Sequence, residues 1–299
     1  MGGRLKEGWR LSSGASDAGN GTDKAGMPFV LGPRLTAIAA LVPTGSVVAD
    51  IGTDHAALPI ALVRAHRVPR AIASEVVPAP LEYARRVVVE AGCASLVDVR
   101  FGSGLSVLQP GEAECIVLAG MGAWTILDII HAHPEVARTA VALVLQPQTE
   151  PELVRRTLAQ EGFGLLDERL SREGERFYVV MAYRWTGETV TRVPAAGVGE
   201  AQTASRGAVG HPIPPVAPNP ADIPANLLWE IGPRLLTTGD PLLVPFLRHL
   251  AAIEERKLSG QGRGTTTRAR AARARTTKRL AVLKRLADEY SRKVTGGER

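Results

Sequence analysis

The sequence has few cysteines and no long apolar run. Its two cysteines, Cys93 and Cys115, stand in apolar surroundings among 299 residues, which excludes a disulfide scaffold and predicts buried thiols in a reducing cytoplasm. No apolar run approaches the ~20 residues that span a bilayer, and the N-terminal segment lacks the apolar stretch of a signal peptide. Cysteine and histidine nowhere cluster with the spacing of metal ligands. We therefore expect a cytoplasmic protein without a membrane or metal partner.

The chain also lacks the G-x-G-x-x-G motif with which dinucleotide-binding folds hold a pyrophosphate. A short β-branched run over residues 46–49 leads instead into Asp50-Ile-Gly-Thr-Asp-His55. The carboxylates of Asp50 and Asp54 would repel phosphates, while Gly52, which has no Cβ, lets backbone approach a ligand. On this motif alone, an ordinary turn between a strand and a helix is an equal alternative.

Four more short apolar runs follow, and each ends in glycine, an acid or a polar side chain. Residues 71–74 precede Glu75, 97–101 precede Gly102-Ser-Gly104, 115–118 precede Ala119-Gly-Met-Gly122, and 141–145 precede Gln146. Nearly continuous apolar runs are typical of parallel strands covered by helices on both faces. Because ligands bind at the carboxyl ends of such strands, we predict an α/β fold, a Rossmann-like doubly wound sheet with a site along one edge.

Acids around the first turn favour a ligand that has a cationic end and a ribose. S-adenosylmethionine fits, because it carries a sulfonium and an α-ammonium beside an adenosine. In nucleotide-binding sheets an acid at the tip of the second strand accepts hydrogen bonds from ribose hydroxyls, which assigns that role to Glu75. The predicted cofactor-binding residues are Asp50, Gly52, Asp54, Glu75, Gly102, Ser103, Gly104 and Ala119. Asp50 and Gly52 would shape the methionine end, and residues 102–104 the adenine edge.

Motifs spread along the chain resemble one family. They are LGPRLTAIA at residues 31–39, VADIGTDHA at 48–56, LPI at 58–60, SEV at 74–76, DVR at 98–100, LAGMG at 118–122, LQP at 145–147 and NLLWEIGPRL at 226–235. In order and spacing they resemble the bacterial tRNA (adenine-22-N1)-methyltransferases, the TrmK family. The resemblance implies a class I methyltransferase fold, S-adenosylmethionine as methyl donor, and N1 of an adenosine in the D-arm region of tRNA, position 22, as acceptor.

Four positions depart from the pattern of the resembled family. Ala57 stands where tyrosine is usual, Ala123 replaces the last glycine of an A-G-M-G-G run, Ser103 stands where Asn or Asp is common, and Gln148 where Asn is frequent. These differences concern the positioning of the substrate more than the binding of the cofactor.

The predicted chemistry needs little acid or base catalysis. N1 of neutral adenine has a free lone pair, so the enzyme mainly aligns N1, methyl carbon and sulfur, and the target base must leave its stack. The candidate catalytic residues are Asp54, His55, Gly120, Met121 and Gln146. Asp54 and His55 would orient the substrate or the α-ammonium, with a helix N-cap as an alternative for Asp54. Gln146 would bond the adenine edge or cap its strand.

Two further residues have open roles. Trp124 could stack on a splayed base. However, Ile126, Leu127 and Ile130 follow at helical spacing, which predicts that it lies in the core. Arg34, in the expected first helix, would either meet a phosphate or cover the cofactor cleft.

Composition divides the chain into four parts. Residues 1–26 are polar and aperiodic, which predicts a disordered tail, and Met27 is a candidate start. Residues 27–186 form the predicted methyltransferase domain, and 187–224, rich in Pro, Gly and Ala, a flexible linker. Residues 225–299 form a helical, coiled-coil-like extension, with helical apolar spacing over 227–258 and 267–292 that predicts an antiparallel pair.

The extension is strongly basic. Residues 256–299 hold 14 lysines and arginines against three acids, a net charge of +11, whereas the whole chain carries +6. Such an arm predicts binding to tRNA through its phosphates, because aromatic residues that could stack on bases are almost absent from it. A solvated helix face or a disordered basic tail is the alternative.

Two other function classes stay open. The first is a class I methyltransferase acting on another RNA position, a protein or a small molecule, although a basic arm argues against the last. The second is a non-catalytic RNA-binding relative, against which the complete set of Asp50, Gly52 and Glu75 argues. The oligomeric state is open, with a monomer among the options.

Overall fold

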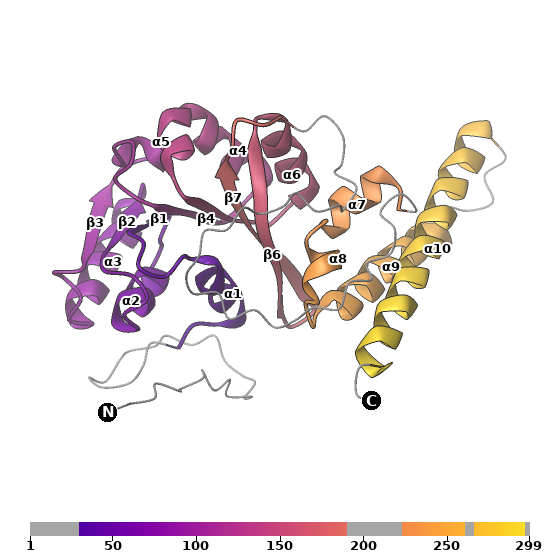
Figure 1. The fold of residues 1–299 in the computed structure, drawn as a ribbon, viewed down its shortest axis with the longest axis horizontal. Helices are drawn as coiled ribbons and strands as arrows, with labels where there is room; N and C mark the ends of the chain where they lie inside the picture. The colour runs from indigo at the N-terminus through magenta and orange to yellow at the C-terminus, as the bar shows by residue number, and fades with distance from the viewer. Residues whose placement is uncertain (1–29, 190–222, 261–265, 297–299) are drawn as a thin grey trace, which may run out of the picture.

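A seven-stranded sheet forms the centre of the computed structural model, which describes residues 30–189, 223–260 and 266–296 (Figure 1). Its strand order is β3-β2-β1-β4-β5-β7-β6. The strands are β1 Val48–Ile51, β2 Ala71–Glu75, β3 Val97–Phe101, β4 Cys115–Met121, β5 Ala142–Pro147, β6 Phe163–Glu173 and β7 Arg176–Trp185. Strands β1 to β5 are parallel, and β7 pairs antiparallel with both β5 and β6. The strand order reverses between β1 and β4, which places a ligand crevice at their carboxyl ends.

Helices cover both faces of the sheet. One face packs against α1 Pro33–Leu41, α2 Ala57–Arg64 and α3 Pro78–Glu90, and the other against α4 Ala123–Ala132, α5 Pro134–Thr139 and α6 Pro151–Gln160. Successive strand residues point to opposite faces, so Val117 lies in the first core and Leu118 in the second. Both cores are apolar, which explains the continuous apolar runs and confirms the predicted fold class.

The first of the two predicted C-terminal helices is divided in the structure. Residues 227–258 form three helices and not one, namely α7 Ala225–Ile231, α8 Leu235–Thr238 and α9 Leu243–Gly260. The helical conformation is interrupted at Gly232-Pro233, where Gly232 has φ +107°, and again at Gly239, where φ is +68°. Left-handed glycines end helices, and a proline cannot continue one. The final helix is α10 Thr267–Gly296.

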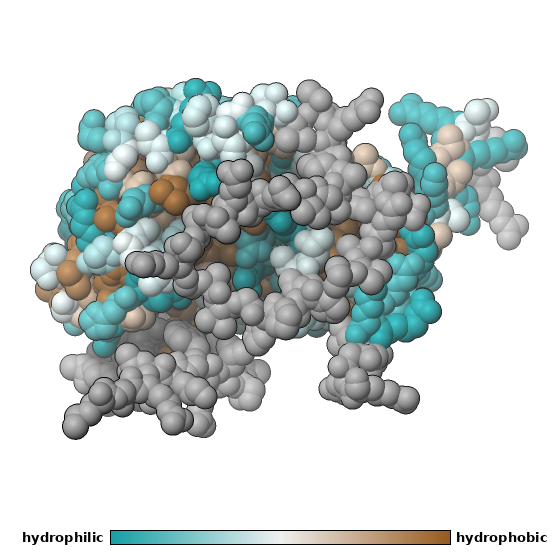
Figure 2. All heavy atoms as spheres, in the orientation of Figure 1, coloured by the Kyte–Doolittle hydropathy of each residue, from teal (hydrophilic) through white to brown (hydrophobic). Residues whose placement is uncertain are grey.

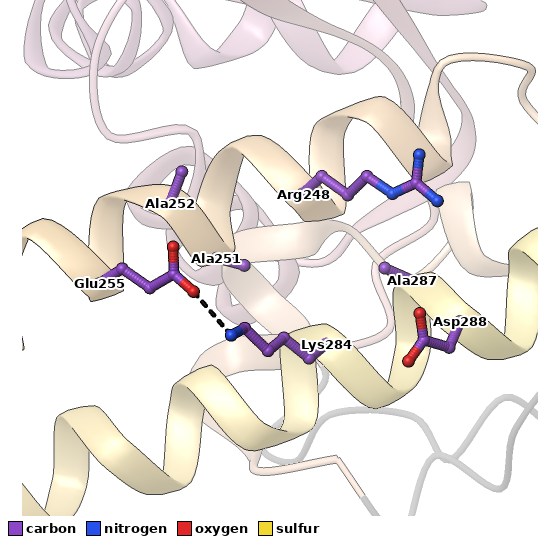
Figure 3. A pocket seen from close by; sticks show the side chains of 7 residues that line it. All are labelled: Arg248, Ala251, Ala252, Glu255, Lys284, Ala287 and Asp288. Carbon is purple, nitrogen blue, oxygen red and sulfur yellow. Dashed lines mark ion pairs between the residues drawn. The ribbon is translucent and has the colours of Figure 1, made fainter.

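Helices α9 and α10 pack side by side beyond β6 (Figure 1). The pair is antiparallel, because Arg273 near the start of α10 donates to the carbonyl oxygen of Leu258 near the end of α9. A shallow groove between the two helices is lined by Arg248, Ala251, Ala252, Glu255, Lys284, Ala287 and Asp288 (Figure 3). Lys284 Nζ lies 2.6 Å from Glu255 Oε1 across this groove.

The C-terminal helices share one apolar core with the sheet domain. Leu227, Leu235 and Leu247 of α7 to α9, with Leu283 of α10, belong to the same buried cluster as Leu118. The helices therefore pack as part of the domain. In the described ranges, no helix has the length and apolarity needed to cross a membrane, and no three His, Cys, Asp or Glu side chains gather closely enough to hold a metal ion.

Three predictions concern residues 1–27 and most of 187–224, which lie outside the described residues. They are the disordered tail, the start at Met27 and the flexible linker. At the borders of the linker, β7 ends at Trp185 and α7 begins at Ala225.

A buried ion pair joins the extension to the sheet. Arg155 of α6 and Glu168 of β6 have no exposed side-chain surface, and Arg155 Nε donates to Glu168 Oε1 at 2.6 Å. Arg155 Nη1 donates to the carbonyl oxygens of Trp229 and Glu230 at 2.6 and 3.1 Å, and the backbone N–H of Arg234 donates to Glu168 Oε2 at 2.9 Å. The pair thus satisfies backbone groups on both sides of the break between α7 and α8.

Replacing Arg155 with methionine should destabilise the protein by about 3–5 kcal/mol, because Glu168 would keep a buried charge without its partner. The double variant Arg155→Met, Glu168→Leu should recover most of that loss. The exposed Arg85–Glu82 pair supplies the control, since Arg85→Met should cost less than about 1 kcal/mol. Denaturant unfolding measures all three, and equal losses for Arg155→Met and Arg85→Met would contradict the assignment.

Candidate active site

The turn after β1 is bonded to the end of β2. The N–H groups of Gly52 and Thr53 both donate to the carbonyl oxygen of Ser74, each at 2.9 Å. Gly52 has φ +73°, and a Cβ there would lie 2.6 Å from Met121 Cε. The absent side chain thus leaves room for Met121 of β4, and two amides that could hold a phosphate are already occupied.

Asp50 is a buried acid at the floor of this turn. Thr53 Oγ1 donates to its Oδ2 at 2.7 Å. Burial raises the pKa of Asp50 to about 6, although the Thr53 hydrogen bond and the Arg34 cation both favour the charged form. The nearby Glu75 carboxylate raises the pKa further. Asp50 is therefore a carboxylate that gains from a cation placed beside it.

Backbone donors fix the Glu75 carboxylate at the tip of β2. Its Oε1 accepts from the N–H groups of Val76 and Val77 at 2.8 and 3.0 Å, and its Oε2 faces the N–H of Asp54 at 3.3 Å. The residue is only 8% exposed. Glu75 thus ties the turn after β1 to the turn after β2 and holds an acceptor at the sheet edge.

Asp54 and His55 lie at the rim of the site. Asp54 Oδ2 is 3.4 Å from His55 Nε2, and both side chains are more than half exposed. The His55 ring contacts the edge of Tyr83, with ring centroids 4.5 Å apart. Asp54 is not the N-cap of α2: that position is Ala56, which has φ 56° and no side-chain cap. The N-cap alternative for Asp54 was therefore wrong.

Asp54 itself also has φ 56°, in the left-handed region. Two non-glycine residues of this turn, Asp54 and Ala56 on either side of His55, thus adopt a conformation that costs free energy and tends to occur at functional sites.

The loop after β3 packs tightly. Gly102 donates its N–H to the carbonyl oxygen of Glu75 at 3.1 Å, and a Cβ on Gly102 would lie 2.4 Å from Val107 Cγ1. A Cβ on Gly104 would lie 3.2 Å from Ile129 Cγ2 of α4. Ser103, between the two glycines, is exposed. The loop therefore lies flat beside Glu75, with Ser103 on the open side.

Apolar side chains that the sequence analysis missed flank this loop. Val76 is 53% exposed and Val77 49%, although they follow the buried strand β2, and Phe101 at the end of the edge strand β3 is 59% exposed. Their signal in the sequence was an apolar residue directly beside a strand-end acid or glycine. They give the edge next to Glu75 the apolar surface that an aromatic ring can cover.

A hydrogen-bond network closes the end of β4. Gln146 is completely buried, and its Oε1 accepts from Gly120 N at 3.2 Å and from Arg34 Nη1 at 3.1 Å. Its Nε2 donates to the carbonyl oxygen of Pro147 at 3.0 Å. This arrangement favours the capping alternative for Gln146 over direct contact with a base. The register of β4 against β5 shifts between Ala119 and Met121, and such a bulge re-aims nearby side chains.

Arg34 belongs to this network through its side chain. Its guanidinium lies 6.0 Å from the centre of the Tyr178 ring and lowers the pKa of Asp50. Its backbone N–H donates to Glu173 Oε1 at 3.1 Å. Arg34 therefore lies beside the carboxyl ends of β4 and β5, and both of its predicted roles, at a phosphate or over the cofactor cleft, stay predictions.

Trp124 is 62% exposed, so the prediction that it lies in the core was wrong. It stands in the first turn of α4, whose buried residues are Ala123, Ile126, Leu127 and Ile130. Helical spacing alone placed Trp124 near that apolar face, but the ring projects outside it. An exposed indole thus stands next to Gly122 at the carboxyl edge of the sheet.

The sheet order, the switch between β1 and β4, and the acids at two adjacent strand ends define a nucleotide-type site of a doubly wound fold. Residues 31–181 match the family model described as a methyltransferase domain, which is half of the chain. The chain therefore belongs to the methyltransferase domain family.

Among curated proteins, the tRNA (adenine(22)-N(1))-methyltransferase of Bacillus subtilis is 38% identical over 151 residues, which cover 50% of this chain and 63% of that relative. The crystal structure of the B. subtilis m1A22 tRNA methyltransferase TrmK superposes with a TM-score of 0.65 at 25% identity, covering 87% of this chain and 99% of that chain. TrmK of M. capricolum, in complex with S-adenosylhomocysteine, superposes at 0.61 and 18% identity, covering 86% and 98%. The fold, including the C-terminal helices, is therefore shared with both structures.

The raised pKa of Asp50 predicts an unusual dependence of stability on pH. When the pKa of an acid is higher in the folded than in the unfolded protein, the acid contributes to the stability of the folded state. This contribution is fully present below the unfolded pKa and is lost as the pH rises through the folded pKa. The ordinary pKa of an aspartate is 3.8 and the pKa of folded Asp50 is about 6, so this stability is lost between about pH 4 and pH 6. Relative to Asp50→Asn, the wild type should lose about 3 kcal/mol across that window. Chemical unfolding of both proteins at several pH values measures this, and a constant difference would contradict it.

Proposed function

We propose that this protein transfers a methyl group from S-adenosylmethionine to N1 of an adenosine in tRNA, at position 22 in the D-arm region. Membership of the methyltransferase domain family and the named B. subtilis relative support this assignment. The observation that carries it is the pair of buried acids, Asp50 and Glu75, at adjacent strand ends of the crevice. We also propose that the protein acts in the cytoplasm, where its tRNA substrate is found.

The residues at the sheet edge fit S-adenosylmethionine. The buried Asp50 carboxylate suits a cation such as the α-ammonium, and Gly52 with Met121 suits the region of the sulfonium. Glu75 suits the ribose hydroxyls, and the flat loop at residues 102–104 with Val76 suits adenine. The buried Ser74 Oγ has no hydrogen-bond partner among the described residues, so a polar ligand atom could satisfy it.

The mechanism asks for alignment more than for acid or base catalysis. When bound, S-adenosylmethionine supplies an electrophilic methyl carbon on a sulfonium. That carbon would pass to the lone pair of adenine N1, with the electron pair of the broken carbon–sulfur bond left on sulfur and the positive charge taken up by the base. Met121, Gly120 and the Arg34–Gln146 network would hold the two reactants in line. Trp124 is exposed beside this region, where it could stack on the displaced base.

The extension supplies a basic surface for the rest of the tRNA. Arg268, Arg270, Arg275 and Lys278 in the first half of α10 are exposed. By contrast, Arg279 pairs with Glu230 and Glu254, and Lys284 with Glu255, in the part that packs on α9. Hydrophilic residues dominate the outer surface of the C-terminal helices, on the right of Figure 2. Exposed cations of this kind bind phosphates without reading sequence.

Incubation with labelled S-adenosylmethionine and bulk bacterial tRNA should yield 1-methyladenosine, identified by nucleoside mass spectrometry and mapped to position 22. A different methylated nucleoside would refute the acceptor and favour another RNA position. Absence of transfer to tRNA despite cofactor binding would favour a protein acceptor or a non-catalytic relative.

Glu75→Ala should weaken S-adenosylmethionine binding by about 2 kcal/mol, because hydrogen bonds to a charged acceptor contribute this much. Calorimetry measures the affinity, and circular dichroism verifies the fold. Glu90→Ala, an exposed acid at the end of α3, serves as the matched control and should bind normally. Unchanged affinity in Glu75→Ala would exclude the ribose-binding role.

Replacing Arg268, Arg270, Arg275 and Lys278 with glutamine should weaken tRNA binding and flatten its salt dependence. Each lost phosphate contact lowers the slope of log K against log salt by about 0.7–0.9, or about 3 for four contacts. Four exposed arginines of the catalytic domain, Arg156, Arg169, Arg176 and Arg184, form the control variant. Filter binding at several salt concentrations measures the slopes, and cofactor affinity should not change. Equal slopes for wild type and the α10 variant would mean that these four side chains make no phosphate contacts and are only solvated.

A further inference from the structure

A short strap, residues 146–150, crosses the carboxyl end of β4. The N–H of Gln148 donates to the carbonyl oxygen of Met121 at 2.8 Å. Thr149 Oγ1 lies 3.6 Å from the position that a Cβ on Gly122 would take, and Glu150 has a left-handed φ of 48°. The strap is therefore held against residues 120–122, the segment that would face the methyl acceptor.

The two glutamines of the strap have opposite environments. Gln146 is completely buried, and its oxygen is shared by Arg34 and Gly120. Gln148 is exposed, and its side-chain amide makes no hydrogen bond to any other described residue. Gln148 Nε2 lies 3.8 Å from the Cβ position of Gly120, and Arg34 Nη1 lies 3.7 Å from the same point. The free amide of Gln148 thus lies beside the Gly120 backbone, next to the Arg34 guanidinium.

We propose that Gln148 is the residue that recognises adenine, an inference that rests on the proposed function. A glutamine amide matches the N6/N7 edge of adenine, because Oε1 accepts from the N6 amino group while Nε2 donates to N7. This contact leaves N1, on the neighbouring edge, open to the methyl donor. Guanine presents a carbonyl oxygen in place of the amino group, so the same amide orientation would place two acceptors against each other.

The same contact favours the reaction. As N1 takes the methyl group, positive charge spreads to the N6 amino group, so its hydrogen bond to Gln148 Oε1 strengthens in the transition state. Gln146 and Arg34 act differently, since they position Gly120 and the strap. Gln148 therefore determines specificity, and its loss should lower kcat more than it raises KM.

A cycle of protein and substrate changes tests the proposal. The full-length wild type and Gln148→Ala are assayed on tRNA that carries either adenosine or 7-deazaadenosine at the methylated nucleotide, where the analogue lacks the N7 acceptor. Gln148→Asn, which keeps an amide, and Gln109→Ala, an exposed glutamine in the loop that precedes the opposite end of β4, complete the set. Cofactor affinity is measured for every variant.

On ordinary tRNA, Gln148→Ala should be about 10-fold or more slower in kcat/KM, as expected for loss of a bidentate base contact. Gln148→Asn should recover part of the rate, whereas Gln109→Ala should match the wild type. The ratio of adenosine to 7-deazaadenosine activity should be about 5-fold or more higher in the wild type than in Gln148→Ala, and comparing the two ratios cancels the intrinsic reactivity of the analogue.

Equal ratios in the two proteins, or a wild-type rate in Gln148→Ala, would overturn the role of Gln148 while tRNA methylation itself still stands. Failure of the proposed function gives a different result, because the wild type would then form no N1-methylated nucleoside on either substrate.

Discussion

The path of the chain from the sheet to the C-terminal helices, and with it the placement of the proposed tRNA-binding surface, depends on one buried ion pair, Arg155 with Glu168. Both side chains lack exposed surface, and together they satisfy backbone groups of Trp229, Glu230 and Arg234. A Cβ on Gly232 would lie 2.7 Å from Arg155 Nη2, so the chain passes the pair where only glycine fits. A buried pair of this kind adds little net stability against an apolar pair of the same size, but breaking it is costly. Its contribution is to fix one path of the chain between sheet and extension.

Hydrogen bonds also restrain the carboxyl edge of the sheet, where the candidate site lies. Asp50, Glu75 and the turn after β1 are connected through backbone N–H groups, so the two acids cannot move apart without breaking the turns that hold them. The pKa of Asp50 is raised because the folded protein buries its carboxylate away from water. Keeping the charged form there costs folding free energy. A bound cation would offset that cost. The hydrogen bonds among the turns already hold the two acids in place without a ligand.

Features that depend on neighbouring residues in the chain could be predicted from the sequence. Apolar runs ending in glycine or acid located the parallel strands and their functional edge, because a buried parallel strand must be apolar on both faces. Other features depend on partners far along the chain. Arg155 and Glu168 are 13 residues apart and meet α7 more than 60 residues later. The breaks at Gly232 and Gly239 override the apolar spacing of residues 227–258. Trp124 shows what periodicity cannot predict: apolar neighbours at helical spacing do not determine whether a side chain at the border of the apolar face is buried.

The proposed recognition of tRNA divides into two tasks that depend on different interactions. The exposed cations of α10 attract phosphates over long range, but they cannot select one adenosine, since every nucleotide carries the same charge. Selection of a position must then come from the fixed distance between α10 and the crevice, and selection of the base from short-range hydrogen bonds at the strap. The first requires a rigid joint, which the Arg155–Glu168 pair provides. The second requires an uncommitted polar side chain at the acceptor side of the crevice, and Gln148 meets that condition where the buried Gln146 does not.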